Sequence, residues 1–289
     1  GPEEARGLIV TSSASTESWH PQGRWVDIDG VRTHLVRSGS KSKPSVLLLH
    51  GFLMSSWAWR HNIDVLSRDF DVIAPCLRGF GWSERDEGSH DIHSLGGFVL
   101  KLLDHLEVTR TSVIGNSLGG ALAIWVARHA PERITRVVLV NALAISDLAP
   151  KVPAILTMSF MAPLYRIAVS PSVARVGLQI LAYKGIRVGA EYLAGFSEQV
   201  RPRRSVRTML EVASHLSANV AWVDAQLEQI SQPVLITWGE RDRILGARPG
   251  RILKKRIPDG RLITFPDCGH CPHEEAPEAF NHAVSTFFT

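Results

Sequence analysis

Residues 111–128 read TSVIGNSLGGALAIWVAR, an apolar and β-branched run that meets a serine and continues with helical spacing. This pattern predicts a strand that turns directly into a helix at Ser117. Gly115 and Gly119, two residues before and two after the serine, allow a strained elbow that holds the hydroxyl out from the end of a sheet. We therefore expect the other functional groups to gather around this hydroxyl.

Strand-like and helix-like segments alternate on both sides of the elbow. Continuous apolar runs, typical of parallel strands covered on both faces, occur at 45–49, 71–74, 137–140, 234–238 and 262–265. Helical spacing occurs at 57–66, 95–106, 248–256 and 277–288. This alternation predicts an α/β fold, in which helices flank a mostly parallel sheet of the eight-stranded type and ligands bind at the carboxyl ends of the strands.

Two further segments lie outside this alternation. Residues 25–28 and 33–36 flank Asp29-Gly30, which predicts a β-hairpin with a type I′ turn. Residues 144–228 carry helical spacing and several prolines but no strand-like run. We therefore divide the chain into a tag scar and flexible arm at 1–20, a core at 21–143 and 229–289, and a helical cap at 144–228, inserted after the sixth strand.

The composition restricts the class of protein. The chain has 289 residues, of which 45% are hydrophobic, and this is ample for a large core. No apolar run reaches the roughly 18 residues that span a bilayer, so we expect a soluble protein without an integral membrane segment. The net charge of +4 is spread along the chain without interleaved aromatic residues, which disfavours nucleic acid as a partner.

The three cysteines and the first two residues bear on localisation. An odd, small number of cysteines favours a reducing compartment, most simply the cytoplasm. Gly1-Pro2 is typical of the remnant of a cleaved purification tag, which leaves the native start and any removed targeting segment open. The sequence does not indicate an oligomeric state.

A serine hydroxyl is a weak nucleophile near neutral pH and needs a base that a third group orients. Two predicted strands end in residues of the required types. Gly239-Glu240-Arg241-Asp242 follows one strand, and Asp267-Cys268-Gly269-His270 follows the next. Both segments lie at carboxyl ends of strands, the same edge of the sheet as Ser117. The sequence thus supplies a candidate base and candidate acids.

The order serine, aspartate, histidine, together with five motifs, resembles the α/β-hydrolase family over roughly residues 22–289. The motifs are His50-Gly51-Phe52, Leu77-Arg78-Gly79-Phe80-Gly81-Trp82-Ser83, Gly115-Asn116-Ser117-Leu118-Gly119-Gly120, Trp238-Gly239-Glu240-Arg241-Asp242 and Gly269-His270-Cys271-Pro272-His273-Glu274. The resemblance implies Ser117 as nucleophile, His270 as general base and then acid, and Asp242 as the orienting carboxylate. It implies no metal and no organic cofactor.

The resemblance also ranks the neighbouring groups. The backbone N–H groups of Phe52 and Leu118 would form the oxyanion hole. Glu240 is the second candidate for the acid, whereas Asp267 lies too near its strand end, and Asn141 carries an amide that cannot stabilise an imidazolium as a carboxylate does. His50 is expected to brace the oxyanion loop.

The substrate is expected to be a small, mainly hydrophobic molecule. Candidate substrate contacts, several of which are as simply explained as cap core or structural support, are Trp82, Asn116, Met158, Met161, Tyr165 and His273. Relatives commonly carry an aspartate where this chain has Cys76, which we interpret as a small buried residue.

The resemblance predicts hydrolysis of an ester, a thioester or an activated carbonyl through an acyl-enzyme. The serine at the elbow disfavours dehalogenase and epoxide hydrolase chemistry, whose relatives carry an aspartate there. Asn116 is similar to its counterpart in meta-cleavage-product hydrolases, so cleavage of a carbon–carbon bond is an alternative. A slow-turnover receptor-like protein is another. Cys268 and Cys271 resemble a disulfide isomerase motif, but they lie where the hydrolase histidine belongs, and a zinc site lacks a second ligand pair.

Overall fold

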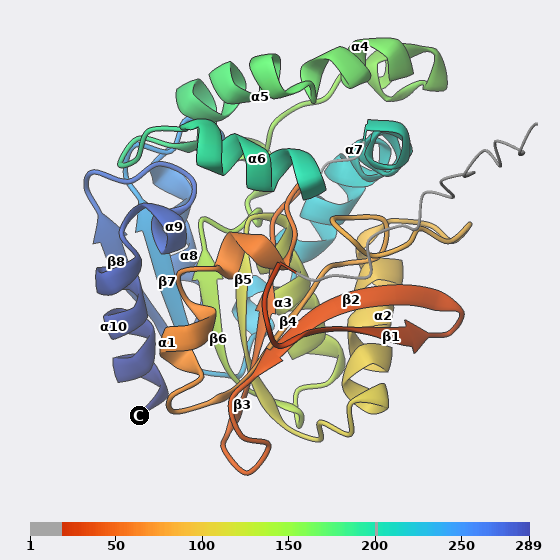
Figure 1. Cartoon of the computed structure of the whole chain (residues 1–289). Coiled ribbons are helices and arrows are strands. Elements are labelled where there is room, and N and C mark those ends of the chain that lie inside the picture. Colours follow the sequence, from red (N-terminus) through yellow and green to blue (C-terminus); the bar gives the residue numbers. More distant parts are fainter. Residues whose placement is uncertain (1–18, 200–201) are drawn as a thin grey trace, which may run out of the picture.

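The centre of the molecule is an eight-stranded sheet with the order β1-β2-β4-β3-β5-β6-β7-β8 (Figure 1). The computed structural model describes residues 19–199 and 202–289, so most of the predicted arm at 1–20 lies outside the described residues. The strands are β1 (Gly23–Ile28), β2 (Val31–Ser38), β3 (Ser45–Leu49), β4 (Asp71–Pro75), β5 (Thr111–Asn116), β6 (Ile134–Val140), β7 (Val234–Gly239) and β8 (Gly260–Phe265). The predicted α/β class with a mostly parallel sheet is confirmed.

The first two strands form the predicted hairpin at one edge of the sheet. Its turn residues Asp29 and Gly30 have φ values of 51° and 80°, as a type I′ turn requires. β1 pairs with β2 and β2 pairs with β4 in antiparallel fashion, whereas β3 to β8 pair with one another in parallel. The carboxyl ends of β3 to β8 therefore meet at one edge of the sheet.

Helices cover both faces of the sheet, because the central strands are apolar on both sides. On β3, Leu47 and Leu49 pack into one core and Val46 and Leu48 into the other. The first core includes helices α2 (Ile92–His105), α3 (Leu118–His129) and α8 (Arg248–Arg256), and the second includes α1 (Ile63–Leu66) and α10 (Pro277–Phe288). The central strands are therefore packed between two helical layers.

Helices alone connect β6 to β7 among the described residues, as predicted for 144–228. They lie over the carboxyl edge of the sheet (Figure 1), and we call them the cap. The cap comprises η2 (Ser146–Leu148), η3 (Ala154–Thr157), η4 (Ser159–Met161), α4 (Ala162–Ala168), α5 (Pro171–Gly177), the π-helical turn η5 (Leu178–Ala182), α6 (Ala190–Gln199), α7 (Pro202–Asp224) and η6 (Leu227–Gln229). Within the described ranges, none of the helices has the length and hydropathy needed to cross a bilayer.

Two short elements differ from the sequence-based expectation. The helix expected at 57–66 is split into a 3₁₀ turn, η1 (Ser56–Trp59), and the single-turn α1. Another single turn, α9 (Pro272–Glu275), begins two residues after His270 and carries Pro272 in its first turn. A four-residue helix is too short to produce a periodic apolar pattern.

Candidate active site

Ser117 occupies the predicted strained elbow between β5 and α3. Its φ and ψ are 53° and −114°, a conformation that costs a non-glycine residue on the order of 1–3 kcal/mol. The Ser117 backbone N–H donates to the Val140 carbonyl (3.0 Å) and its own carbonyl accepts from Gly120, which fixes the turn.

Two glycines make this elbow possible. A Cβ on Gly115 would lie 2.1 Å from the carbonyl oxygen of Gly119, and a Cβ on Gly119 would lie 2.1 Å from that of Leu49. Neither neighbour can yield, because both are backbone atoms. Helix α3 can therefore start against the strand ends only if both positions remain glycine.

His270 and Asp242 meet beside the elbow. His270 Nδ1 lies 2.8 Å from Asp242 Oδ2, and both side chains are buried. Asp242 follows β7 and His270 follows β8, which pair in register up to Gly239 and Phe265. The second oxygen of Asp242 accepts the backbone N–H groups of Ile244 (2.7 Å) and Leu245 (3.0 Å). The carboxylate is therefore fixed at both oxygens.

Asn141 supports the carboxylate, a role that the sequence did not reveal. Its Nδ2 donates to Asp242 Oδ2 (2.7 Å), and its Oδ1 accepts the backbone N–H of Gly239 (2.9 Å). Burial raises the pKa of Asp242, but the nearby His270 and the donors around the carboxylate outweigh burial and hold the pKa below its ordinary value. Asp242 is thus an anion that can stabilise an imidazolium.

The competing acids lie away from this pair. The Glu240 side chain is 35% exposed and faces Arg251, whereas Asp267 is 81% exposed and pairs with Arg241 at 2.8 Å. The geometry therefore favours Asp242 over both.

His50 holds the peptide that carries the first candidate oxyanion donor. The His50 Nε2 accepts the backbone N–H of Leu77 (2.9 Å), so the proton is on Nδ1, which donates to the Gly51 carbonyl (2.8 Å). Burial lowers the pKa of His50 to about 4 and keeps the ring neutral. The Gly51 carbonyl and the Phe52 N–H belong to the same peptide unit, so His50 orients that N–H. Among the described residues, neither the Phe52 nor the Leu118 N–H has an acceptor.

An apolar cavity of about 200 Å³ adjoins the serine. Ser117 and both proposed oxyanion residues, Phe52 and Leu118, line it. Its other walls include Leu143, Val152, Val212, Leu216 and Ile244, from the loop after β6, the cap and the turn after β7. Both the core and the cap thus enclose the space in front of the hydroxyl.

The predicted substrate contacts do not line this cavity among the described residues. Asn116 is buried below it, where its Nδ2 donates to the carbonyls of Val140 (3.1 Å) and His270 (3.2 Å). Trp82 is buried beside His34. Met158 is 53% exposed on the outside of the cap, and Met161 and Tyr165 are partly exposed.

His273, which was expected either to contact substrate or to support the structure, is also placed away from the cavity. Its ring is fully buried, with its centroid 4.4 Å from that of Trp59 and a second ring contact to Phe280. Desolvation holds the pKa of His273 well below its ordinary value. The side chain supports the packing of α9 rather than facing a ligand.

The cysteines are buried thiols. Cys76 lies beside Ser56 and His34, and burial raises its pKa. Burial also raises the pKa of Cys268 to about 12 and that of Cys271 well above its ordinary value. A redox motif needs an accessible, low-pKa thiol, so the geometry favours the hydrolase interpretation of this stretch.

Two adjacent glutamates, to which the sequence analysis assigned no role, tie the histidine loop to the cap. Glu275 Oε1 accepts the backbone N–H groups of Gly269 (2.9 Å) and Cys271 (3.2 Å), on both sides of His270. Its Oε2 accepts those of Lys184 and Gly185 in the cap, each at 2.6 Å.

The second glutamate and the histidine backbone extend this connection. Glu274 accepts from the cap residue Tyr183 (2.6 Å) and pairs with Arg60. The His270 N–H itself donates to the Ala182 carbonyl at 2.7 Å. The cap and the candidate base are therefore one hydrogen-bonded unit.

Comparison with known proteins agrees with this geometry. The model of the alpha/beta hydrolase family matches residues 46–283. The 2-hydroxy-6-oxo-2,4-heptadienoate hydrolase of Pseudomonas putida is 31% identical over 278 residues, covering 92% of this chain and 95% of the relative. The hydrolase YugF of Bacillus subtilis is 25% identical and covers 90% and 95%. Among solved structures, the meta-cleavage product hydrolase CumD of Pseudomonas fluorescens matches with a TM-score of 0.76, 26% identity, and 92% and 97% coverage.

Proposed function

The chain belongs to the alpha/beta hydrolase family, and we propose that it is a serine hydrolase that cleaves esters or thioesters of small hydrophobic acids. The observation that carries this proposal is the elbow serine in an apolar cavity beside a buried, hydrogen-bonded His270–Asp242 pair. Such a pair supplies the base that a serine needs.

The proposed reaction has two stages. His270 Nε2, the ring nitrogen not engaged by Asp242, accepts the Ser117 proton while Oγ attacks the carbonyl carbon. The Phe52 and Leu118 N–H groups hold the oxyanion, and the leaving alcohol or thiol takes the proton from His270 as the acyl-enzyme forms. His270 then accepts a proton from a water molecule as the water oxygen attacks the acyl carbon. The bond to Ser117 Oγ breaks, the acid is released, and His270 returns a proton to Oγ.

The cavity favours an apolar acyl group over the dienoate cleaved by the Pseudomonas putida relative. The name of that substrate includes a carboxylate, a hydroxyl and a ketone, which need polar or cationic partners when buried. No lysine or arginine lines the cavity in the described part of the chain. Cleavage of a carbon–carbon bond by the same three residues is thus the second candidate, and its support is the sequence similarity to that relative.

The central test is covalent labelling of Ser117. A serine-reactive phosphonate should add to wild-type Ser117, located by mass spectrometry, and p-nitrophenyl ester turnover should fall at least about 10³-fold in Ser117→Ala. Ser112→Ala, on the same strand, is the matched control. Absence of both labelling and ester hydrolysis would contradict the proposal, and a burst without sustained turnover would favour the receptor-like alternative.

The cavity volume predicts the acyl-chain preference. A space of about 200 Å³ is below the roughly 300–1,000 Å³ of drug-sized ligand pockets, so short-chain p-nitrophenyl esters should have the highest kcat/KM. Leu216→Ala shortens a side chain in the cavity wall, which enlarges the cavity, and should move the highest kcat/KM to esters with longer acyl chains. An unchanged optimum in this variant would show that the acyl group binds elsewhere.

A further inference from the structure

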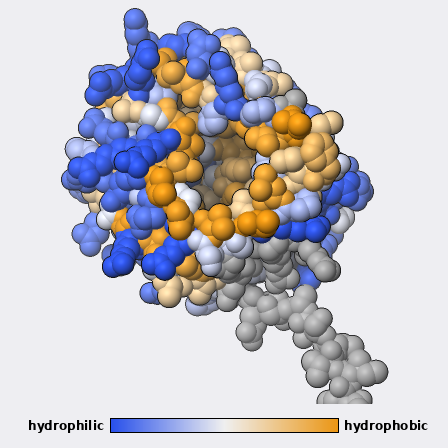
Figure 2. All heavy atoms as spheres, turned by 90° about the horizontal axis from the view of Figure 1, so that it is seen from above, coloured by the Kyte–Doolittle hydropathy of each residue, from blue (hydrophilic) through white to orange (hydrophobic). Residues whose placement is uncertain are grey.

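The outer surface of the cap exposes an unusual number of large apolar side chains. Of the eleven that are exposed among the described residues, nine lie between 155 and 181. We call these nine residues the outer cap face: Ile155, Met158, Phe160, Leu164, Ile167, Val173, Val176, Ile180 and Leu181. Seen from above, hydrophobic side chains surround a hollow (Figure 2). Contiguous apolar surface of this kind marks a binding surface in a folded protein.

The helices of the outer cap face have two apolar sides. Val173, Val176 and Ile180, at positions i, i+3 and i+7, are about half exposed, whereas Ala174 and Ala182 are buried in the cap core. On α4, Leu164 and Ile167 are 53% and 61% exposed. Packing within the chain accounts for the inner side only, so the outer side has no partner among the described residues.

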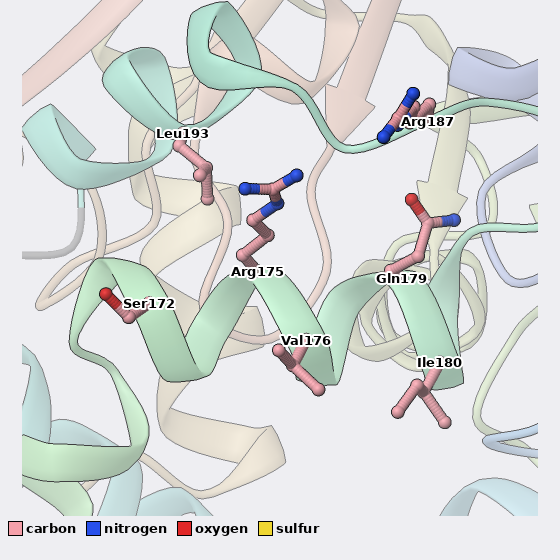
Figure 3. Close-up of a pocket in the computed structure, with 7 residues that line it drawn as sticks. All are labelled: Ser172, Arg175, Val176, Gln179, Ile180, Arg187 and Leu193. Carbon is pink, nitrogen blue, oxygen red and sulfur yellow. The ribbon is translucent and has the colours of Figure 1, made fainter.

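All charged residues in the segment that carries the outer cap face are cationic. Residues 148–190 contain five lysines and arginines and no aspartate or glutamate. Lys151, Arg166, Arg175 and Arg187 are exposed, and none of them forms an ion pair with a described residue. The side chains of Arg175 and Arg187 extend into a cleft of about 580 Å³ beside α5 (Figure 3). Val176 and Ile180 lie along the same cleft.

This charge distribution decides between occupants. In a symmetric dimer the face would meet itself and bring these unpaired cations together, which is unfavourable. An anionic lipid surface instead offers acyl chains to the apolar residues and phosphates to the arginines. We infer that the outer cap face docks the protein on anionic membranes, with the Arg175–Arg187 cleft receiving a lipid phosphate. This inference concerns docking and does not depend on the proposed chemistry.

Vesicle flotation of the full chain tests the inference. The protein should float with phosphatidylcholine–phosphatidylglycerol vesicles, bind pure phosphatidylcholine at least tenfold more weakly, and lose affinity as salt rises. Arg175→Glu combined with Arg187→Glu should raise the half-binding lipid concentration roughly twentyfold or more. Leu164→Gln combined with Ile167→Gln should weaken binding at low and high salt alike, because it removes the apolar contact.

Matched controls lie away from the cap. Lys254→Glu combined with Lys255→Glu makes the same charge change on α8, and Ile263→Gln replaces an exposed apolar residue on β8. All variants should keep the circular dichroism spectrum and soluble-ester turnover of the wild type. The inference is overturned if the wild type does not bind vesicles, or if the α8 control loses as much vesicle affinity as the Arg175→Glu/Arg187→Glu variant. It is also overturned if the protein forms a dimer that the Leu164→Gln/Ile167→Gln variant dissociates, while no vesicle binding is seen. Retained ester turnover would keep such a failure separate from the proposed function.

Discussion

His50 links two backbone segments, the one that carries the Gly51–Phe52 peptide and the one that contains Leu77. One ring nitrogen donates to the Gly51 carbonyl and the other accepts from the Leu77 N–H, so the ring fixes two backbone segments at once. Because the Phe52 N–H shares a peptide plane with the Gly51 carbonyl, a rotation of that plane would turn the donor away from the cavity. We therefore regard His50 as a positioning residue for the proposed oxyanion hole.

Substitution of His50 should lower the rate with little effect on substrate binding. Loss of one oxyanion donor costs about 10²–10³-fold in kcat, so His50→Ala, which only loosens that donor, should cost roughly 10–100-fold. His50→Asn keeps a side-chain N–H for the Gly51 carbonyl and should recover part of the rate. The measurement is kcat and KM on the best p-nitrophenyl ester. Equal losses in both variants would contradict positioning through the Gly51 carbonyl.

At the residue scale, the sequence predicted which residues form the candidate site better than it predicted which groups hydrogen-bond to them. Ser117, Asp242 and His270 could be placed because strand ends meet at one edge of a parallel sheet. The support from Asn141 could not be placed, since it depends on a φ of 41° and on a rotamer that faces Asp242. The substrate contacts could not be placed either, because the direction of a cap side chain depends on how the cap packs over the core.

At the scale of elements, α9 links the cap to the core. Its residue Glu275 accepts four backbone N–H groups, two from the His270 loop and two from the cap. A single carboxylate therefore ties the loop that carries the proposed base to the 184–185 segment of the cap. Longer helices such as α8 and α10 lie where helical spacing was expected. Helix α9 was not expected, because its stability comes from these tertiary contacts and not from its own periodicity.

Glu275→Gln should disturb catalysis as well as stability. The amide nitrogen cannot accept a hydrogen bond, so two of the four N–H groups lose their acceptor, at a cost of roughly 2–4 kcal/mol in the free energy of unfolding. Because the His270 loop then shifts relative to Ser117, we expect kcat to fall about tenfold and the acid limb of the kcat/KM profile to move. Urea titration and pH–rate measurements test both effects.

The control for this prediction is Glu278→Gln. Glu278 is exposed on α10, three residues further along the chain, and accepts no hydrogen bond among the described residues. It should behave as the wild type. A Glu275→Gln variant that loses stability but keeps its pH–rate profile would show that the glutamate only supports the fold.

At the scale of the whole molecule, buried neutral histidines make the fold sensitive to acid. Burial lowers the pKa of His50 and of His34 to about 4, against an ordinary value of 6.5. Between these values the unfolded chain binds protons that the folded chain excludes, so stability is present above pH 6.5 and is lost as the pH falls towards 4. The raised pKa of buried Glu274 works in the opposite direction and offsets part of this loss.

The expected loss is large compared with the stability of an ordinary domain. At 1.36 kcal/mol for each pKa unit, the two histidines together lower the free energy of unfolding by on the order of 5 kcal/mol between pH 6.5 and 4, out of a typical 5–15. Urea unfolding at pH 7.5, 6.5, 5.5 and 4.5 measures this slope. His34→Gln should make the slope shallower, because one proton-excluding site is removed, whereas His282→Gln, at an exposed position on α10, should leave it unchanged. If the free energy of unfolding instead began to fall only below pH 4, the loss would be due to carboxylates such as Asp242, whose pKa is lowered. That result would contradict a role for the buried histidines.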